Sequence, residues 1–263
     1  MQLEKTASSH ITHLLKKTVS GQAAGKHNRL PGRFRRSRRH VIGSIRNPWD
    51  WYLSLWSFGC RGRGGLYLRQ TKRSVRGHGL RTHPLLGMIH VAHELVKSTR
   101  PWRLLYTDID DALLFRKWLR QVMDPARKWD LGDFYALSPV SECAGFMTFR
   151  YLYLYSDTVR PLFCRGRINT LERVRAFDRG HTVLDDTIRV EELETDLIRI
   201  LTACDIPLND HQLDYIHSIG RTNVSRKQQE PGSYYDAETI ELVRRKERLI
   251  IDKYKYSVPF VSD

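Results

Sequence analysis

The segment HVIGSIRNPWDWYLSLWSFG, residues 40–59, changes from one kind of secondary structure to another within a few residues. VIGSI (41–45) is a short, largely apolar run with β-branched residues, which is typical of a buried strand. Asn47 can then cap a helix, and Pro48 occupies the first helical position, where proline is tolerated. The segment therefore predicts a strand that is followed directly by a helix.

A second unit of the same kind follows later in the chain. DDTIRV (185–190) predicts a strand, and EELETDLIRILTACD predicts the helix after it. Leucines recur every four residues on that helix and line one of its faces: Leu193, Leu197 and Leu201. Strands that alternate with helices indicate an α/β protein with a mainly parallel sheet.

The remaining sequence predicts five further helices, at 8–18, 85–97, 111–123, 144–156 and 236–254. Residues 60–83 are rich in Gly, Arg and Lys, and we expect them to form a long basic loop that is mobile without a ligand. No internal repeat is present, and we expect the 263 residues to form a single domain.

The chain is strongly basic, with 44 Lys and Arg against 29 Asp and Glu and a formal net charge of +15. This charge points to anionic partners (nucleotides, nucleic acid, sulfated or phosphorylated substrates, or a membrane surface) or simply to a basic surface. The four cysteines form no C-x-x-C pair, so reduced thiols in a cytoplasmic protein are expected. We find no signal peptide and no apolar stretch of the ~18 residues that a membrane helix needs.

Residues 5–9, KTASS, form a polar loop directly before the first predicted helix. A helix start favours an anion, because its backbone N–H groups point at the ligand and the helix dipole is positive there. Lys5 adds a full positive charge, and Thr6, Ser8 and Ser9 add hydroxyl donors. The structural alternative is that Ser8 or Ser9 only caps the helix.

A Walker A phosphate loop is excluded by the spacing. The nearest match is GQAAGKHN, residues 21–28, which is one residue short between its glycines. His27 also stands where such a loop has the Ser or Thr that binds Mg²⁺.

Together, KTASS and SIRNPWDWYLSLW resemble two motifs of the sulfotransferase family that uses 3'-phosphoadenosine 5'-phosphosulfate (PAPS). In that family a Lys-Thr-small-small-Ser/Thr loop cradles the 5'-phosphosulfate, and an RNP-x-D-x-x-x-S segment binds the 3'-phosphate. The resemblance implies that Arg46 and Ser54 bind the 3'-phosphate. It also implies a cradle for the 5'-phosphosulfate made by Lys5, Thr6, Ala7, Ser8 and Ser9.

The resemblance extends over nearly the whole chain. DDTIRVEELETDLIRIL is similar to the family's strand and E-x-L-x-x-D helix, and AGFMTFRYLYLY resembles an element of its carbohydrate-modifying branch. RTNVSRK and the last predicted helix are similar to the family's C-terminal loop and final helix. The resemblance implies a P-loop-like sulfotransferase fold, with a central, mainly parallel sheet flanked by helices. It further implies a loop that closes over the nucleotide and contains Asn223, Ser225 and Arg226.

One feature departs from the family. The family places a buried apolar strand before the phosphosulfate loop, whereas only Met1, Gln2 and Leu3 precede Glu4 here. A central strand of about five or six residues is usual. We therefore expect a truncated first strand: either the start lies upstream, together with any membrane anchor, or the sheet is weakened.

Sulfuryl transfer needs in-line geometry, stabilised charge and a base. Lys5 is the candidate for stabilising the charge on the transferred group and the leaving oxygen, and no metal is expected. His27 is the candidate base, because its ordinary pKa suits neutral pH and because a Lys-His step stands at this place in the carbohydrate branch. Glu4 is the second candidate base. His10 and His13 lack a third metal ligand nearby.

The sequence thus favours an enzyme that transfers a sulfuryl group from PAPS to a hydroxyl of a carbohydrate or another polar acceptor. Three alternatives remain: a basic nucleic-acid-binding protein, a nucleotide kinase with a degenerate loop, and an inactive sulfotransferase relative. Nucleic-acid binding would depend steeply on salt and would be independent of PAPS. Trp49 and Trp56 are expected in the core rather than stacked on the adenine.

Overall fold

A computed structural model describes residues 1–19, 27–29, 40–74, 84–132, 134–164, 166–218 and 231–259 of the chain. Two strands lie within these ranges, β1 Ile42–Ile45 and β2 Asp186–Arg189. The α-helices are α1 Ser8–Thr18, α2 Pro48–Cys60, α3 Gly65–Thr71, α4 Pro84–Val96, α5 Arg100–Leu104, α6 Ala112–Met123, α7 Val140–Cys143, α8 Phe146–Tyr155, α9 Leu171–His181, α10 Leu193–Ala203, α11 Asp210–Ser218, α12 Pro231–Tyr234, α13 Ala237–Lys246 and α14 Arg248–Tyr254. The 3-10 helices are η2 Pro125–Leu131, η3 Tyr135–Leu137, η4 Arg160–Phe163 and η5 Val190–Glu192.

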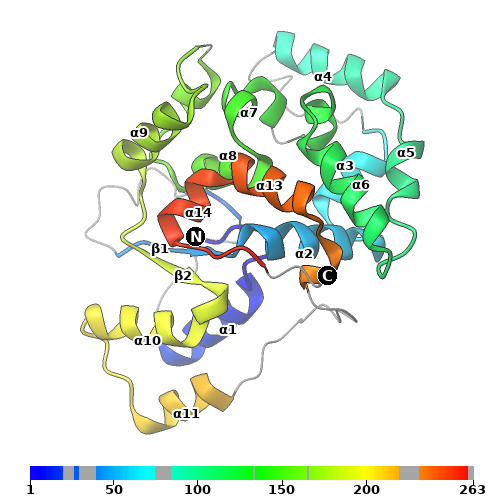
Figure 1. Ribbon diagram of the computed structural model, residues 1–263. Coiled ribbons are helices and arrows are strands. Elements are labelled where there is room, and N and C mark those ends of the chain that lie inside the picture. Colours follow the sequence, from blue (N-terminus) through cyan, green and yellow to red (C-terminus); the bar gives the residue numbers. More distant parts are fainter. Residues whose placement is uncertain are drawn as a thin grey trace.

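The two strands pair in parallel, in a register that runs from Ile42 opposite Asp186 to Ile45 opposite Arg189. In Figure 1 they cross the middle of the molecule, with α1, α10 and α11 on one side and most other helices on the opposite side. The predicted α/β architecture with parallel strands is confirmed. In the part of the chain that the structure describes, however, the sheet has only two strands, so the broad central sheet that the resemblance implied is not seen there.

Residues 1–3 lie alongside β1 without forming a regular strand. The amino group of Met1 donates a hydrogen bond to the Ile42 carbonyl at 2.7 Å. The Tyr155 hydroxyl accepts from the backbone N–H groups of Leu3 (2.8 Å) and Ser44 (3.1 Å), and it donates to the Ser44 carbonyl (2.7 Å). A phenol from α8 thus takes the place that strand-to-strand hydrogen bonds would occupy, which explains why the sheet does not extend to these residues.

Most predicted helices are confirmed. The predictions at 8–18, 85–97, 111–123 and 144–156 correspond to α1, α4, α6 and α8 within about two residues at each end. The Asn47 side chain caps α2 by accepting from the Trp49 N–H at 3.1 Å, as predicted. The last predicted helix is divided into α13 and α14 at Glu247.

The prediction of a loop over 60–83 is wrong for Gly65–Thr71, which forms α3. Leu66 and Gln70 of this helix are buried, so packing against the rest of the molecule outweighs the glycine-rich composition. Residues 75–83 lie outside the described part of the chain.

The apolar residues form two clusters, one on each side of the strands. The smaller cluster joins α1, β2, α10 and α11 through residues such as Ile11, Ile188 and Leu197. The larger cluster contains five fully buried tryptophans: Trp49, Trp51, Trp56, Trp102 and Trp118. The prediction that Trp49 and Trp56 belong to the core is therefore confirmed.

Candidate functional site

The loop that precedes α1 lies where residues 1–3, β1 and β2 all reach their carboxyl ends. In open parallel sheets this edge is the usual place for a ligand. Two contacts hold the loop against α2 and the end of β1: the Trp51 indole N–H on α2 donates to the Glu4 carbonyl at 2.6 Å, and Nη1 of Arg46, which follows β1, donates to the Lys5 carbonyl at 3.5 Å. The fold therefore brings together the two sequence segments that carry the predicted anion-binding residues.

The backbone of this loop is turned at two positions that are not glycine. Lys5 has φ 61° and Ala7 has φ 52°, so both lie in the left-handed region. Residues other than glycine rarely adopt this conformation, which is found most often at turns and binding sites. Between them, Thr6 is fully buried: its hydroxyl donates to the Leu3 carbonyl (2.6 Å) and is hydrogen-bonded to the Ser44 hydroxyl (2.6 Å). The Thr6 side chain thus holds the loop against β1.

The start of α1 differs from the expected arrangement in which Ser8 or Ser9 caps the helix. The residue before the helix is Ala7, and no described side chain caps the helix. The Ser8 hydroxyl donates instead to the Leu3 carbonyl at 3.2 Å, and Ser9 is exposed in the first turn. The expectation that Ser8 or Ser9 caps α1 is therefore wrong. Among the described residues α1 thus begins without a side-chain cap, and a helix start of this kind suits an external anion.

Lys5 is half-buried, and its ammonium group lies over the Phe58 ring, 2.9 Å from the ring centroid. Burial lowers the pKa of Lys5 to about 8, and the positive charges of Arg46 and Arg61 contribute to the same shift while Glu4 opposes it. Three cations thus converge on the loop. An anion placed among them would stabilise the charged form of Lys5.

Arg46 follows β1 and faces both the loop and α2. Its guanidinium lies 3.7 Å from the Asp50 carboxylate, and its Nε is buried without a hydrogen-bond partner among the described residues. A buried donor without a partner is costly, so an acceptor at this position would be stabilising. Ser54 lies one helical turn beyond Asp50 on α2 and is buried, with 5% of its surface exposed.

His27 is exposed and lies against the beginning of the chain. Its Nδ1 is 2.9 Å from the Gln2 carbonyl. Because a carbonyl only accepts, Nδ1 carries the proton and Nε2 of the neutral ring is left as an acceptor. The second candidate base, Glu4, has its carboxylate in an ion pair with Arg150 at 3.0 Å. The geometry therefore favours His27 over Glu4 as the group that accepts a proton.

Two residues beside Lys5 were not singled out from the sequence, namely Arg61 and Phe58. Arg61 belongs to the Gly- and Arg-rich stretch 60–83, where basic residues are too frequent for one to stand out. The predicted nucleotide-closing residues lie outside the described part of the chain: Asn223, Ser225 and Arg226.

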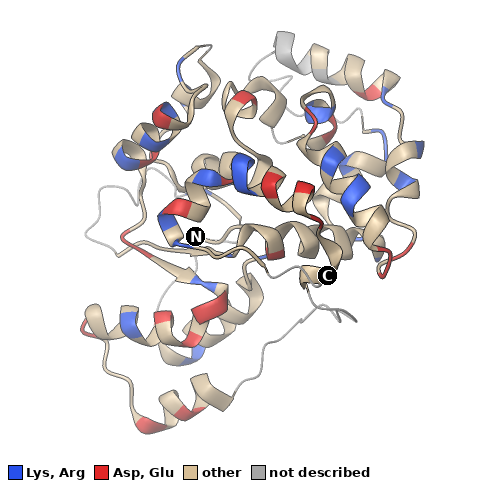
Figure 2. Cartoon of the chain, in the orientation of Figure 1, with Lys and Arg blue, Asp and Glu red and all other residues tan. Residues whose placement is uncertain are grey.

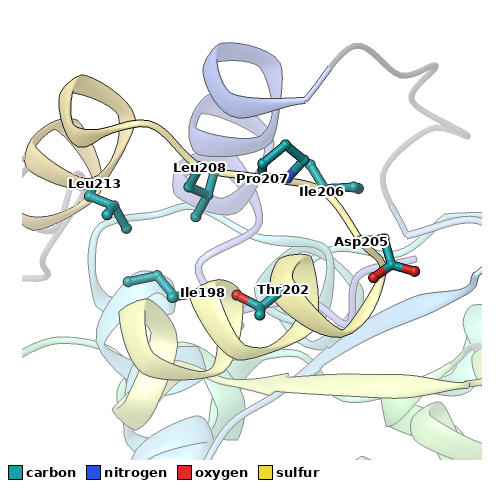
Figure 3. Close-up of a pocket in the computed structure, with 7 residues that line it drawn as sticks. All are labelled: Ile198, Thr202, Asp205, Ile206, Pro207, Leu208 and Leu213. Atoms are coloured by element: carbon teal, nitrogen blue, oxygen red, sulfur yellow. The ribbon is translucent and has the colours of Figure 1, made fainter.

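A separate hollow of about 590 Å³ lies between α10 and α11 (Figure 3). Its lining is largely apolar and comprises Ile198, Thr202, Asp205, Ile206, Pro207, Leu208 and Leu213. Its described lining contains no lysine or arginine and none of the predicted site residues, so this part of the hollow does not suit an anionic ligand.

Basic residues are spread over most helices and are interspersed with acidic ones, as Figure 2 shows. Within the described ranges, no helix is both long and apolar enough to cross a bilayer. Comparisons of the chain with models of protein families, with curated proteins and with solved structures found no match.

Proposed function

We propose that the chain is a sulfotransferase that moves a sulfuryl group from PAPS to a hydroxyl of a carbohydrate or another polar acceptor. The observation that carries the proposal is the meeting of the KTASS loop and Arg46 at the carboxyl edge of the parallel strands. Within the described ranges the start of α1 has no side-chain cap and the Nε of Arg46 has no hydrogen-bond partner, and both features support the proposal because they suit an anionic ligand with two separated charged groups.

Each residue has a distinct role in this proposal. The start of α1 and Lys5 bind the 5'-phosphosulfate, and Arg46 with Ser54 binds the 3'-phosphate. Lys5 stabilises negative charge on the transferred group and on the leaving oxygen, a task for which a preorganised cation is well suited. His27 accepts the acceptor's proton at Nε2 while the Gln2 carbonyl holds Nδ1–H. PAPS supplies the activated sulfuryl group.

The proposal predicts selectivity for a 3'-phosphorylated nucleotide. Calorimetry at moderate salt without metal should show that 3'-phosphoadenosine 5'-phosphate binds at least about tenfold more tightly than adenosine 5'-phosphate, a difference of ~1.4 kcal/mol. Arg46→Ala should weaken binding of the bisphosphate by about 10- to 100-fold, because a charge-assisted contact is lost, and should change binding of the monophosphate much less.

Arg167→Ala, an exposed arginine on another part of the molecule, is the matched control and should change neither affinity. Equal losses of affinity for both nucleotides in Arg46→Ala would show that Arg46 does not bind the 3'-phosphate. Binding of neither nucleotide by the wild type, together with steeply salt-dependent binding of DNA or RNA, would favour the nucleic-acid-binding alternative.

The proposal also predicts the effect of removing the base. His27→Ala should lower the turnover rate by about 10²–10⁴-fold and leave nucleotide affinity unchanged, since the imidazole moves a proton and does not hold the phosphates. Initial rates with labelled PAPS and a panel of glycan acceptors would measure this. His211→Ala, an exposed histidine on α11, serves as the control. An unchanged rate in His27→Ala combined with a large loss in Glu4→Gln would assign the base to Glu4.

A further inference from the structure

Helix α4 (Pro84–Val96) lies at the outer rim of the molecule, beside α3 and α5 (Figure 1). Four of its large apolar side chains are exposed: Met88 (60%), Ile89 (43%), Leu95 (59%) and Val96 (80%). Ala92, which is also exposed, lies three or four residues from each of them, and Met88 and Ile89 lie seven residues from Leu95 and Val96. These spacings place all five residues along one side of the helix. We call this set, Met88, Ile89, Ala92, Leu95 and Val96, the α4 stripe.

The described polar side chains at the carboxyl end of α4 face the protein. Glu94 and Lys97, the residue just beyond the helix, are 5% and 3% exposed and form an ion pair of 2.7 Å. Glu94 also accepts from the Ser74 N–H (2.8 Å), and Lys97 also donates to the Arg69 carbonyl (2.6 Å). His93 Nε2 lies 3.2 Å from the buried carboxylate of Asp130.

Among its described side chains, α4 is therefore amphipathic in the reverse sense from an ordinary surface helix, which turns its apolar face to the core. Buried charged groups cost free energy even when they are paired, and exposed aliphatic side chains forgo the gain from burial. A helix that buries charged groups and exposes aliphatic ones is accounted for if its exposed face binds an apolar partner.

Charge indicates which partner fits. Two hydrogen bonds join α3, α4 and α5 at the carboxyl end of α4: Arg73 donates to the Lys97 carbonyl (3.1 Å), and Arg103 donates to the Thr71 carbonyl (3.0 Å). Exposed cations from the ends of these helices therefore lie close together there. The cations are Lys72, Arg73, Arg100 and Arg103, and the exposed Leu104 (57%) lies next to the last of them. Figure 2 shows α4 itself almost without charged residues and this basic corner beside it. The sole carboxylate of residues 84–96, Glu94, is buried.

An aliphatic stripe beside a cluster of cations matches the surface of an anionic bilayer, where acyl chains take the apolar face and lipid phosphates and carboxylates take the cations. A protein partner fits less well, since the stripe lacks the Trp, Tyr and Arg residues that anchor protein interfaces. A second copy of the chain is disfavoured because each copy has a formal net charge of +15. With 13 residues, α4 is also too short to cross a bilayer and would lie in its surface.

We infer that α4 is a membrane-surface helix, which inserts the α4 stripe among the acyl chains of an anionic lipid bilayer while Lys72, Arg73, Arg100 and Arg103 bind the headgroups. This inference is independent of the proposed enzymatic function and stands or falls by lipid binding alone.

The test is co-sedimentation of the full chain with vesicles of phosphatidylcholine containing roughly one-third phosphatidylserine, and with vesicles of phosphatidylcholine only. The protein should bind the anionic vesicles and bind the neutral ones at least about tenfold more weakly, because each exposed cation adds attraction to an anionic surface. Leu95→Asn should lower the partition coefficient on anionic vesicles by about tenfold or more, since it removes one buried aliphatic side chain from the lipid.

Leu113→Asn is the matched control, since Leu113 has nearly the same exposure (61%) but lies on α6, away from the stripe. It should leave vesicle binding unchanged, and circular dichroism should show both variants folded. The double variant Lys72→Gln/Arg100→Gln should weaken binding to anionic vesicles, whereas Arg160→Gln/Arg167→Gln, two exposed arginines elsewhere, should not.

Three results would overturn the inference: no binding to anionic vesicles, equal losses in Leu95→Asn and Leu113→Asn, or a dimer in light scattering without lipid that Leu95→Asn dissociates. The last result would assign the α4 stripe to self-association.

Discussion

Replacing Lys5 with Met is expected to abolish the proposed sulfuryl transfer while leaving the ligand-free protein at least as stable as the wild type. Methionine keeps the length of the side chain and its contact with Phe58 but removes the charge. Loss of a preorganised charge at the transferred group lowers rates by about 10²–10³-fold or more. In the ligand-free protein the same charge is unfavourable, because Lys5 is half-buried and near Arg46 and Arg61.

The pKa of Lys5 gives this prediction a dependence on pH. Its folded-state pKa of about 8 lies below the ordinary value of a lysine. Between these two pH values the Lys5 side chain is protonated in the unfolded chain and neutral in the folded one. The contribution of Lys5 to the free energy of unfolding therefore rises with pH over this range and is lowest at and below about pH 8. The gain in stability of Lys5→Met over the wild type should therefore be largest below about pH 8 and should shrink above it.

Activity should depend on pH in the opposite direction. In the proposed mechanism the charged form of Lys5 stabilises the transferred group, so kcat/KM of the wild type should fall as pH rises through about 8. Melting temperatures and initial rates measured across this range would test both statements. Lys17→Met, at an exposed lysine in the last turn of α1, is the control for both. A folded Lys5→Met variant with wild-type activity would show that the assigned role of Lys5 is wrong, and an unfolded variant would contradict the expected stability.

Glu247→Ala is expected to destabilise the protein by about 3–5 kcal/mol, the largest loss from any single substitution considered, because several buried donors lose their acceptor at once. Glu247 is fully buried at the junction of α13 and α14. One of its carboxylate oxygens accepts from the Tyr52 hydroxyl (2.5 Å) and the Met147 N–H (3.3 Å). The other accepts from the N–H (2.8 Å) and hydroxyl (2.6 Å) of Thr148.

Glu247 in effect caps α8, whose first turn contains Met147 and Thr148 and has no side-chain cap from Gly145. The effect should reach the candidate site, because α8 also carries Arg150, the partner of Glu4, and Tyr155, which joins Leu3 to Ser44. Nucleotide binding should therefore weaken together with stability in this variant.

Urea unfolding of the full chain would measure the loss in free energy of unfolding. Glu241→Ala is the control: Glu241 is 55% exposed, and its ion pair with Arg244 should be worth less than about 1 kcal/mol. Tyr52→Phe should cost less than Glu247→Ala, because it removes one donor and leaves the carboxylate with its backbone donors. A loss of less than ~1 kcal/mol in Glu247→Ala would contradict the capping role.

Much of the local structure could be predicted because its causes are local. Asn47 and Pro48 specify the start of α2 whatever surrounds them, and the apolar periodicity of α1 and α10 predicts both helices. The two strand-to-helix units likewise predicted parallel pairing of β1 and β2. The failures have tertiary causes. α3 forms in a glycine-rich stretch because Leu66 and Gln70 are buried, and the final helix breaks at Glu247, where the carboxylate turns to α8.

The candidate site divides in the same way. From the sequence alone come the expectations of an anionic ligand and a proton acceptor, because the motifs contain a lysine, hydroxyl residues, an arginine and a histidine. The surroundings of these groups follow from tertiary contacts, which bury Thr6 against Ser44, bring Arg61 and Phe58 to Lys5 and place Glu4 in an ion pair with Arg150. The reason is physical, because burial and contacts between residues far apart in the chain set charge, exposure and hydrogen bonding, and no local pattern encodes them.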